Sequence, residues 1–450
     1  STTEILAGAE NYPIKNINAN DIMGESAKIA MPTFNWALYW STVENGYPIP
    51  EDKREGKIWD GTKFTSIEGL GMDGSGTKAD PYVITNGTEL YAAIFSGGNG
   101  YYYVIGNDIV LNEDYMNYKN WGTTAPTNKW TSGSGTDFLG HIDGQGYTIY
   151  GFYATGSDSG LIPRINNKPF AELVTIENIN ISHSFIGDAN VYDGFIVGAI
   201  YWGGSRKVVI NGCNVRNSKM TGISTNGRAG GIVGAICNGS TKVNNCSVAN
   251  VEFTAACDDT GLMGWDGMGS IVGAAYTGAT KGAFNPEGAM RVQITNSFAV
   301  NCIRTNDSKA IYPIGIFAES ATNYFLSVGA KNVYTDADVV NDIPEITVTD
   351  ATSGNTVKYG LKVASVDNTS VAIEPTSANY PIKQISAVSV IGNNAKTVMS
   401  ELNWCYFDTV SGSVPVWADN HIETVLNAVA PTCTETGLTE GKKCSTCNEI

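Results

Sequence analysis

Short apolar segments flanked by Gly or Asn recur through the middle of the chain. Three of them share the run Ile-Val-Gly-Ala, at residues 195–200, 231–236 and 270–275, and a looser copy lies at 314–318. The first two spacings, measured between the valines, are 36 and 39 residues. Apolar runs of this length, bounded by turn residues, predict short β-strands that return once per turn of a repeating structure.

A second series of apolar positions precedes each of these runs. Residues 176–181, 210–215 and 243–248 each carry an apolar residue, an Asn or Gly, a residue of a buried type and a β-branched residue, and 294–297 opens a fourth copy. Asn and Gly tolerate the positive φ of a sharp bend, so each copy indicates two short strands joined at a corner. A β-sandwich gives no reason for such a repeat, and the many Gly and Asn-Gly pairs disfavour helical repeats.

The two series together predict an all-β chain, a right-handed parallel β-helix (a solenoid) with capping elements and a small additional β segment. Equivalent residues of successive coils should then stack in files. One expected file holds Gly198, Gly234 and Gly273; a second holds Asn178, Gly212, Asn245 and Asn296; a third holds Ile179, Cys213, Cys246 and Ser297. We interpret Cys213 and Cys246 as stacked, buried thiols rather than a disulfide, because a bridge between such coils would be strained.

A longer repeat relates the two ends of the chain. Residues 11–36 match 379–404 at 13 of 26 positions without a gap, at a separation of 368 residues. The chain is therefore expected to contain nearly one unit of a tandem array. We divide it into a tail of a preceding unit or N-terminal cap (1–56), the parallel β-helix (57–345), a β insertion with a closing element that repeats 11–48 (346–420), and a truncated Cys-containing repeat (421–450). The regions of Trp36 and Trp404 are expected to pack as closing coils.

The charge and hydropathy of the chain limit the classes of partner that are expected. Only 16% of residues are charged, and the formal net charge is −16. Nucleic acid and anionic lipid both require clusters of Lys and Arg, so neither is expected as a partner. Apolar runs are of strand length, well short of the about 18–20 residues of a membrane helix, so membrane insertion is not expected. No signal-peptide pattern opens the chain at Ser1, and we expect it to be a piece of a longer secreted protein.

The order of motifs ahead of the coils resembles a known family. Residues 76–84 (Gly-Thr-Lys-Ala-Asp-Pro-Tyr-Val-Ile), 89–93, 101–105, 107–111 and 138–149 follow the entry pattern of β-helical, adhesin-like repeat surface proteins of anaerobic gut bacteria, Firmicutes and Bacteroidetes. Tyr147 stands where that pattern usually has His. The Gly-rich coils resemble the repeats of the same proteins. The resemblance covers about residues 57–345 and implies the β-helix and an extracellular place, at the cell surface or secreted, but no particular activity.

The C-terminal segment resembles a small Cys-containing repeat of large extracellular proteins from Clostridia and Ruminococcus-like bacteria. Its His421, Cys433, Cys444 and Cys447 could form a zinc site of the Cys₃His type. A single Cys-x-x-Cys pair is only half of the usual zinc signature, and the other spacings fit it poorly. We therefore favour disulfides or unpaired thiols here and expect no metal and no cofactor.

Few residues in this sequence could form a catalytic site. Parallel β-helices include polysaccharide lyases and glycoside hydrolases, but fold alone does not give function. Asp258 and Asp259 form the only adjacent acidic pair within a coil, and we interpret them as a solvated turn. The three histidines are His141, His183 and His421, and His141 lies in a turn where local hydrogen bonds are expected to satisfy it. We expect no enzyme.

Aromatic residues and Met near the coil edges are the better candidates for ligand binding. The loop 261–268 is an insertion rich in Trp, Met and Gly, and loops on a solenoid face commonly meet ligands. The ligand-binding candidates are Tyr201, Trp202, Met263, Trp265, Met268 and Tyr276. The alternative reading is that these side chains cover the edge of the core.

The sequence thus supports an extracellular, adhesin-like binding module of a bacterial surface protein. Its expected partners are a host or dietary glycan, or a host secreted protein of the mucin or immunoglobulin type, besides neighbouring domains of the tandem array. A structural stalk without ligand is the first alternative, and a polysaccharide lyase or glycoside hydrolase is the second.

Overall fold

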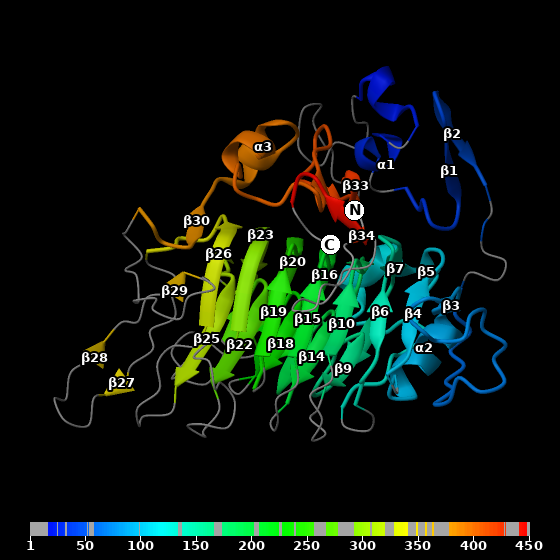
Figure 1. The fold of residues 1–450 in the computed structure, drawn as a ribbon, viewed down its shortest axis with the longest axis horizontal. Coiled ribbons are helices and arrows are strands. Elements are labelled where there is room, and N and C mark those ends of the chain that lie inside the picture. The colour runs from blue at the N-terminus through cyan, green and yellow to red at the C-terminus, as the bar shows by residue number, and fades with distance from the viewer. Residues whose placement is uncertain are drawn as a thin grey trace, which may run out of the picture.

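The computed structural model describes residues 17–447, except 25, 32–33, 52, 54–57, 99, 134–136, 166–172, 202–206, 225–226, 238–239, 256–266, 278–291, 307, 320–327, 341–347, 350–355, 358–361, 364–377, 427 and 429–440. The described part is mostly β-structure. Parallel strands stack into a solenoid of about five turns, with few helices (Figure 1). The predicted parallel β-solenoid is confirmed.

Each turn adds one strand to a sheet of five parallel strands. Its members are β9 (Ile162–Ile165), β14 (Val197–Ile200), β18 (Val233–Ile236), β22 (Val272–Thr277) and β25 (Ile314–Glu319). The small sheet beside it holds β13 (Tyr192–Gly194), β17 (Arg228–Gly230) and β21 (Gly267–Gly269).

The other walls of the solenoid form one sheet of 18 strands, continuous because several strands bend around a corner. Its first coils hold β3 (Tyr82–Ile84), β4 (Tyr102–Ile105), β5 (Ile109–Val110), β6 (His141–Asp143), β7 (Thr148–Tyr150), β8 (Tyr153–Thr155), β10 (Leu173–Glu177), β11 (Asn180–Ser182) and β12 (Phe185–Gly187). The later coils hold β15 (Lys207–Asn211), β16 (Asn214–Ile223), β19 (Ser240–Asn244), β20 (Ser247–Ala255), β23 (Val292–Arg304), β24 (Lys309–Ala310), β26 (Val328–Thr335), β29 (Lys362–Val363) and β30 (Ile382–Gln384).

The predicted glycine file is confirmed. Val197, Val233 and Val272 pair in register along the five-stranded sheet, which places Gly198, Gly234 and Gly273 above one another. A Cβ at Gly234 would lie 2.5 Å from the Gly198 carbonyl oxygen and 2.3 Å from the Asp193 nitrogen. The backbones approach so closely here that a side chain has no room.

The predicted asparagine file is confirmed as well. The pairings on either side put Asn178, Gly212, Asn245 and Asn296 in register. Their φ values run from 48° to 66°, the left-handed region that Asn and Gly tolerate. Asn245 Nδ2 donates to Asn211 Oδ1 at 2.8 Å, so the corner side chains also connect neighbouring coils.

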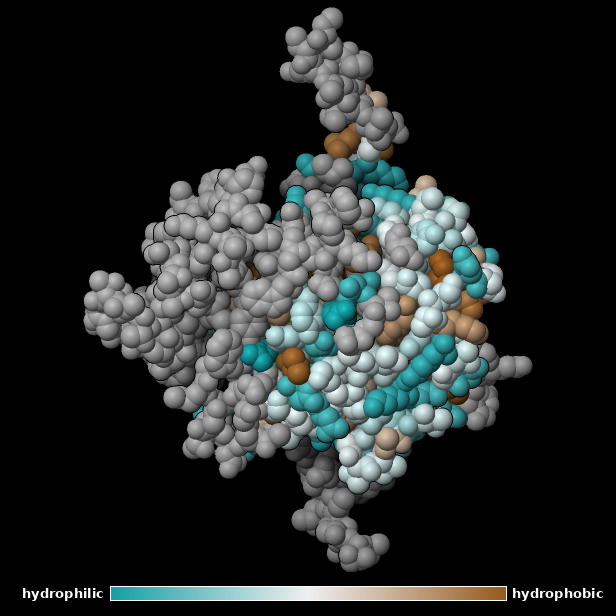
Figure 2. All heavy atoms as spheres, turned by 90° about the horizontal axis from the view of Figure 1, so that it is seen from below, coloured by the Kyte–Doolittle hydropathy of each residue, from teal (hydrophilic) through white to brown (hydrophobic). Residues whose placement is uncertain are grey.

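The interior of the solenoid is apolar and continuous from coil to coil. The third predicted file places Cys213 above Cys246, and both are buried free thiols, as expected. Burial raises the pKa of Cys213, so these residues act as small apolar side chains. On the face seen in Figure 2, the described hydrophobic residues form small separate spots among polar ones.

Helix α2 (Gly87–Phe95) lies at the end of the solenoid that carries β3 and β4 (Figure 1). Asn86 begins it by accepting the Glu89 N–H at 3.0 Å, and Glu89 in turn accepts the Thr85 N–H at 2.7 Å. The first bond satisfies a free donor of the first helical turn, and the second fixes the residue that precedes the cap. Leu90 and Ile94 are buried and cover the end of the core.

The two copies of the long repeat fold alike. The first contains η1 (Ala19–Ile22), α1 (Ser26–Ala30), β1 (Trp40–Val43) and β2 (Gly46–Pro50); the second contains η4 (Ala387–Val390), α3 (Asn394–Val398), β31 (Phe407–Asp408) and β32 (Val416–Trp417). Trp36 Nε1 donates to the Met31 carbonyl at 2.9 Å, and Trp404 Nε1 donates to the Met399 carbonyl at 3.1 Å. The second copy also adds one strand to the solenoid, because β30 pairs in parallel with β26. The short helices and antiparallel ribbons around Trp36 and Trp404 lie outside the parallel ladder.

Both copies lie on the same side of the solenoid (Figure 1). The first packs against Tyr115 and its neighbours, and the second packs on the outer face of the large sheet, where the Phe298 and Phe407 rings are 5.3 Å apart. Asn211 Nδ2 also donates to the Tyr406 hydroxyl at 2.9 Å.

Two small antiparallel pairs complete the chain. β27 (Val348–Thr349) pairs with β28 (Thr356–Val357) in the region where a small β segment is expected, and β33 (Glu423–Leu426) pairs with β34 (Gly441–Cys444). Among the described residues, none of the helices has the length and apolar character needed to cross a membrane.

Candidate functional site

The structure describes two of the six predicted ligand-binding side chains. Trp202, Met263 and Trp265 lie outside the described residues, as do Asp258 and Asp259. Of Tyr276 only the backbone is described, in β22 and in register with Ala318. A ligand-binding role for these positions stays a prediction.

Tyr201 and Met268 both contact other parts of the solenoid. The Tyr201 hydroxyl donates to Asp158, 2.9 and 3.1 Å from its two carboxylate oxygens, and the Arg164 guanidinium lies 5.5 Å from the ring centre. Burial raises the pKa of Asp158. Met268 is half-buried and packs against the core. Tyr201 is therefore part of a polar network at the coil edge, which restrains its ring.

A different set of side chains forms an open groove. It begins with a second file of corner residues, in which the strand pairings put His183, Asn217, Asn250 and Asn301 in register. All four have φ between 45° and 57°. Asn301 Nδ2 donates to Asn250 Oδ1 at 3.1 Å, and Asn250 Nδ2 donates to Asn217 Oδ1 at 3.2 Å. The three amides form a row along the solenoid, about 4.8 Å apart as stacked strands are.

The short helix η2 (Tyr115–Asn120) forms the facing wall. Its Tyr118 is buried and meets the His183 ring edge to face, with ring centres 5.5 Å apart. Burial lowers the pKa of His183 to about 4, so this imidazole is neutral at pH 7. Tyr115 meets the same imidazole at 5.5 Å. These ring contacts hold η2 against the corner file.

One charged cluster crosses the groove. Lys119 Nζ lies 2.5 Å from Glu252 Oε1, and Lys219 Nζ lies 3.7 Å from the other Glu252 oxygen. The carboxylate of Glu252 is thereby paired on both sides. The cluster has two ammonium groups and one carboxylate, so its formal net charge is +1, while the two charged residues that line the groove, Lys119 and Glu252, offset each other.

The groove has a volume of about 760 Å³ and is lined by residues 116–120 of η2, the four corner residues, Glu252 and Ile303. Asn117, Asn120, Asn250 and Asn301 are exposed. Primary amides supply both donors and acceptors, and the rings and Ile303 supply apolar edges. The arrangement is suited to a polar, uncharged ligand that makes many hydrogen bonds.

The groove was not predicted from the sequence, although a signal existed. Asn217, Asn250 and Asn301 each follow a strand residue pair of similar type (Val-Arg, Val-Ala and Ala-Val). The sequence gives no indication that His183 belongs to the same file. The expectation of a turn with local hydrogen bonds at His141 is wrong, because His141 opens strand β6 and its Nδ1 lies 3.0 Å from Oγ1 of Thr175 on the next coil.

Comparisons with known proteins give a single distant likeness. No protein-family profile and no curated protein sequence matches the chain. Among solved structures, one from Bacteroides ovatus described as a "putative immunoglobulin A1 protease" is similar with a TM-score of 0.44 and 17% identity, over 76% of this chain and 94% of that one. At this level of similarity, a functional conclusion has to come from the residues of the groove.

Proposed function

We propose that this solenoid is a binding module of an extracellular bacterial surface protein, and that its groove holds an uncharged oligosaccharide. The observation that carries the proposal is the row of amides from Asn217 to Asn301, which faces the exposed amides of η2 across an open groove.

The chemistry of the groove supports a glycan over a charged ligand. Sugar hydroxyls both donate and accept, and so do the amides of Asn117, Asn250 and Asn301. The amide row repeats along the solenoid axis, so an extended chain of sugar units can meet one corner after another. The net charge of −16 and the paired charges of Lys119 and Glu252 disfavour acidic polymers.

Among the described residues that line the groove, Glu252 is the one carboxylate, and its ion pairs favour binding over hydrolysis. Glycoside hydrolases commonly need two carboxyl groups on either side of the sugar bond. Glu252 is paired with Lys119 and Lys219, and the other lining residues are amides, rings, Lys119, Met116 and Ile303. Release of new reducing ends from any bound glycan would contradict this part of the proposal.

The test is a glycan array probed with the full chain, followed by calorimetry with the glycans that bind. Asn250→Gly is the informative variant, because Gly keeps the positive φ of this corner (57°) and removes the amide. Loss of its hydrogen bonds should weaken binding by roughly tenfold, about 1.4 kcal/mol.

Asn332→Gly is the matched control. Asn332 has a φ of 54° and donates to Asn296 Oδ1 at 3.0 Å, but it belongs to the first corner file, away from the groove. It should bind glycan as the unaltered chain does. If no glycan binds, or if both variants bind as well as the unaltered chain, the groove is not the glycan site. Binding to mucin or immunoglobulin protein free of glycans would instead support the protein-ligand alternative.

Trp265→Ala tests the other surface predicted from the sequence. Weaker glycan capture in this variant, together with unchanged capture in Asn250→Gly, would move the binding site from the groove to the loop 261–268.

A further inference from the structure

Four potential metal ligands meet where the C-terminal hairpin touches the second copy of the long repeat. Cys405, His421, Cys444 and Cys447 each offer one ligand atom, and these atoms all lie within 4.8 Å of one another. Cys405 comes from the closing element, and the other three come from the hairpin segment. Cys433, the sulfur ligand suggested by the sequence, lies outside the described residues.

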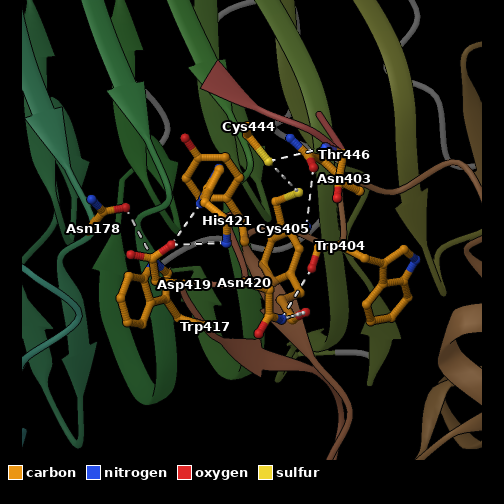
Figure 3. Close-up of polar contacts among 12 residues, drawn as sticks. Asn178, Asn403, Trp404, Cys405, Trp417, Asp419, Asn420, His421, Cys444 and Thr446 are labelled. Atoms are coloured by element: carbon orange, nitrogen blue, oxygen red, sulfur yellow. Dashed lines mark hydrogen bonds and ion pairs between the residues drawn. The ribbon is translucent and has the colours of Figure 1, made fainter. Parts of the chain in front are cut away.

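The spacing of the sulfurs fits a tetrahedral ion. Zn–S bonds of about 2.3 Å at tetrahedral angles place two sulfur ligands about 3.8 Å apart. The Cys405 and Cys444 sulfurs are 3.8 Å apart and face each other in Figure 3. Both residues are buried, which shields such a site from solvent.

The histidine is held in an orientation that suits a metal. Its Nδ1 lies 2.8 Å from Asp419 Oδ1 (Figure 3), which leaves Nε2, a buried atom, as the nitrogen for an ion. The Tyr406 ring meets the imidazole edge to face at 4.8 Å. A carboxylate on the outer nitrogen is the usual support of a zinc-bound histidine.

Backbone hydrogen bonds fix the segments that carry the ligands. The Asn420 N–H donates to the Cys405 carbonyl at 2.8 Å, and the Asn420 side chain donates to the Phe407 carbonyl at 3.0 Å. The Thr446 N–H donates to the Cys444 sulfur at 3.4 Å. Such N–H···S bonds stabilise a thiolate, the form that binds metal.

The two strands of the hairpin, as far as the structure describes it, bury little of their surface. All four residues of β33 are exposed, and so is Ile422, with 62% of its surface accessible. An isolated two-stranded hairpin is marginally stable in water. Small elements without a core of their own commonly depend on a metal or a disulfide.

The first copy of the long repeat provides an internal comparison. The residue after its tryptophan is Ala37, where the second copy has Cys405. The cysteine is present in the copy that the Cys-containing hairpin contacts. We therefore propose that Cys405, His421, Cys444 and Cys447 bind one zinc ion in a closed Cys₃His site that fastens the hairpin to the closing element.

The first experiment measures zinc and cobalt in the full chain. Protein purified with reductant should carry one zinc per chain by mass spectrometry of the metal. After exchange for Co²⁺, the visible bands of a tetrahedral ion and the near-ultraviolet bands of thiolate ligands should appear. A chain that binds less than about a tenth of an equivalent of either metal would overturn the proposal.

Single variants then assign the ligands. Cys405→Ala, which introduces the residue of the first copy, should lose the metal and its cobalt spectrum. Cys433→Ser and Cys302→Ala should keep one equivalent, because Cys433 is not in the set and Cys302 is buried in the solenoid. Metal retained by Cys405→Ala but lost by Cys433→Ser would show that the ligand set is wrong.

Two further readouts separate a zinc site from a disulfide and from misfolding. A disulfide between any two of Cys405, Cys444 and Cys447 in protein purified without reductant and without oxygen would overturn the proposal. A chelator should speed tryptic cleavage next to Lys442 and Lys443 at least several-fold, while the circular dichroism of the solenoid stays unchanged. Unchanged cleavage would show that no metal holds the hairpin.

Discussion

At the scale of single residues, the solenoid depends on side chains that tolerate positive φ at its corners. Asn245 is fully buried, has a φ of 53° and donates to Asn211 Oδ1. Gly212 occupies the same corner one coil earlier, with a φ of 66°. The corner therefore requires a residue that tolerates a left-handed backbone. The amide hydrogen bond is an additional contribution, which the Gly212 corner lacks.

The two contributions can be separated at Asn245. Asn245→Ala should lower the free energy of unfolding by about 2–3 kcal/mol, from about 1–2 for the left-handed backbone and about 1 for the lost hydrogen bond. Asn245→Gly should cost about 1 kcal/mol less, because Gly adopts this φ without a Cβ clash. Urea unfolding of the full chain measures both. Equal losses in the two variants would show that backbone strain is not what selects Asn here.

Asp193 is a buried carboxyl group beside the glycine file. Its Oδ1 accepts the Ser159 N–H at 2.9 Å, and burial raises its pKa to about 8. The unfolded chain ionises the same group near its ordinary pKa of 3.8. Between about pH 4 and pH 8 the folded state thus holds a proton that the unfolded state has released. The contribution of Asp193 to the free energy of unfolding therefore falls as the pH rises through this window, while His183 contributes a rise between about pH 4 and 6.5.

Asp193→Asn should remove most of that fall. The amide oxygen can still accept the Ser159 N–H, and nothing remains to ionise at this position. The variant should be more stable than the unaltered chain at pH 8 by an amount on the order of a few kcal/mol, with a smaller difference at pH 5. Asp158 leaves some slope in the same direction, because burial raises its pKa too. Urea unfolding at the two pH values gives the answer, with the exposed Asp188→Asn as control. Parallel pH profiles for the unaltered chain and Asp193→Asn would contradict a protonated Asp193.

At the scale of elements, the sequence predicts what repeats within the chain. The coil strands could be predicted because each must match its neighbours above and below, which forces Gly198, Gly234 and Gly273 into one register. The likeness of the two long-repeat copies could also be predicted. Their helices and ribbons could not, because the pattern of 11–48 follows neither the period of a strand nor that of a helix.

The sites were harder to predict, because each joins segments far apart in the sequence. Lys119 meets Glu252 across 133 residues, and only the folded coils show that η2 lies over the corner file. In the C-terminal hairpin the nearest cysteine in sequence, Cys433, was the natural choice as a ligand. The fold instead brings in Cys405, from an element that the sequence assigns to another unit.

At the scale of the whole molecule, stacked coils form a quasi-one-dimensional structure in which each coil contacts its neighbours. Ile176, Ile210, Val243 and Ile294 form one buried column, in register from β10 to β23. A defect in one coil should therefore weaken the adjacent coils first, and distant coils should keep their own contacts.

Ile210→Ala tests this behaviour by hydrogen exchange followed with mass spectrometry. The cavity should cost about 2–5 kcal/mol locally, enough to speed exchange in β10, β15 and β19 by more than roughly tenfold. The strands β4 and β26 lie beyond the neighbouring coils and should exchange as they do in the unaltered chain. Val209→Ala is the matched control, since Val209 is on the same strand but only half-buried and should change exchange far less. Faster exchange by the same factor in every coil would show that the solenoid unfolds as one cooperative unit, and that nearest-neighbour contacts do not limit how a defect spreads.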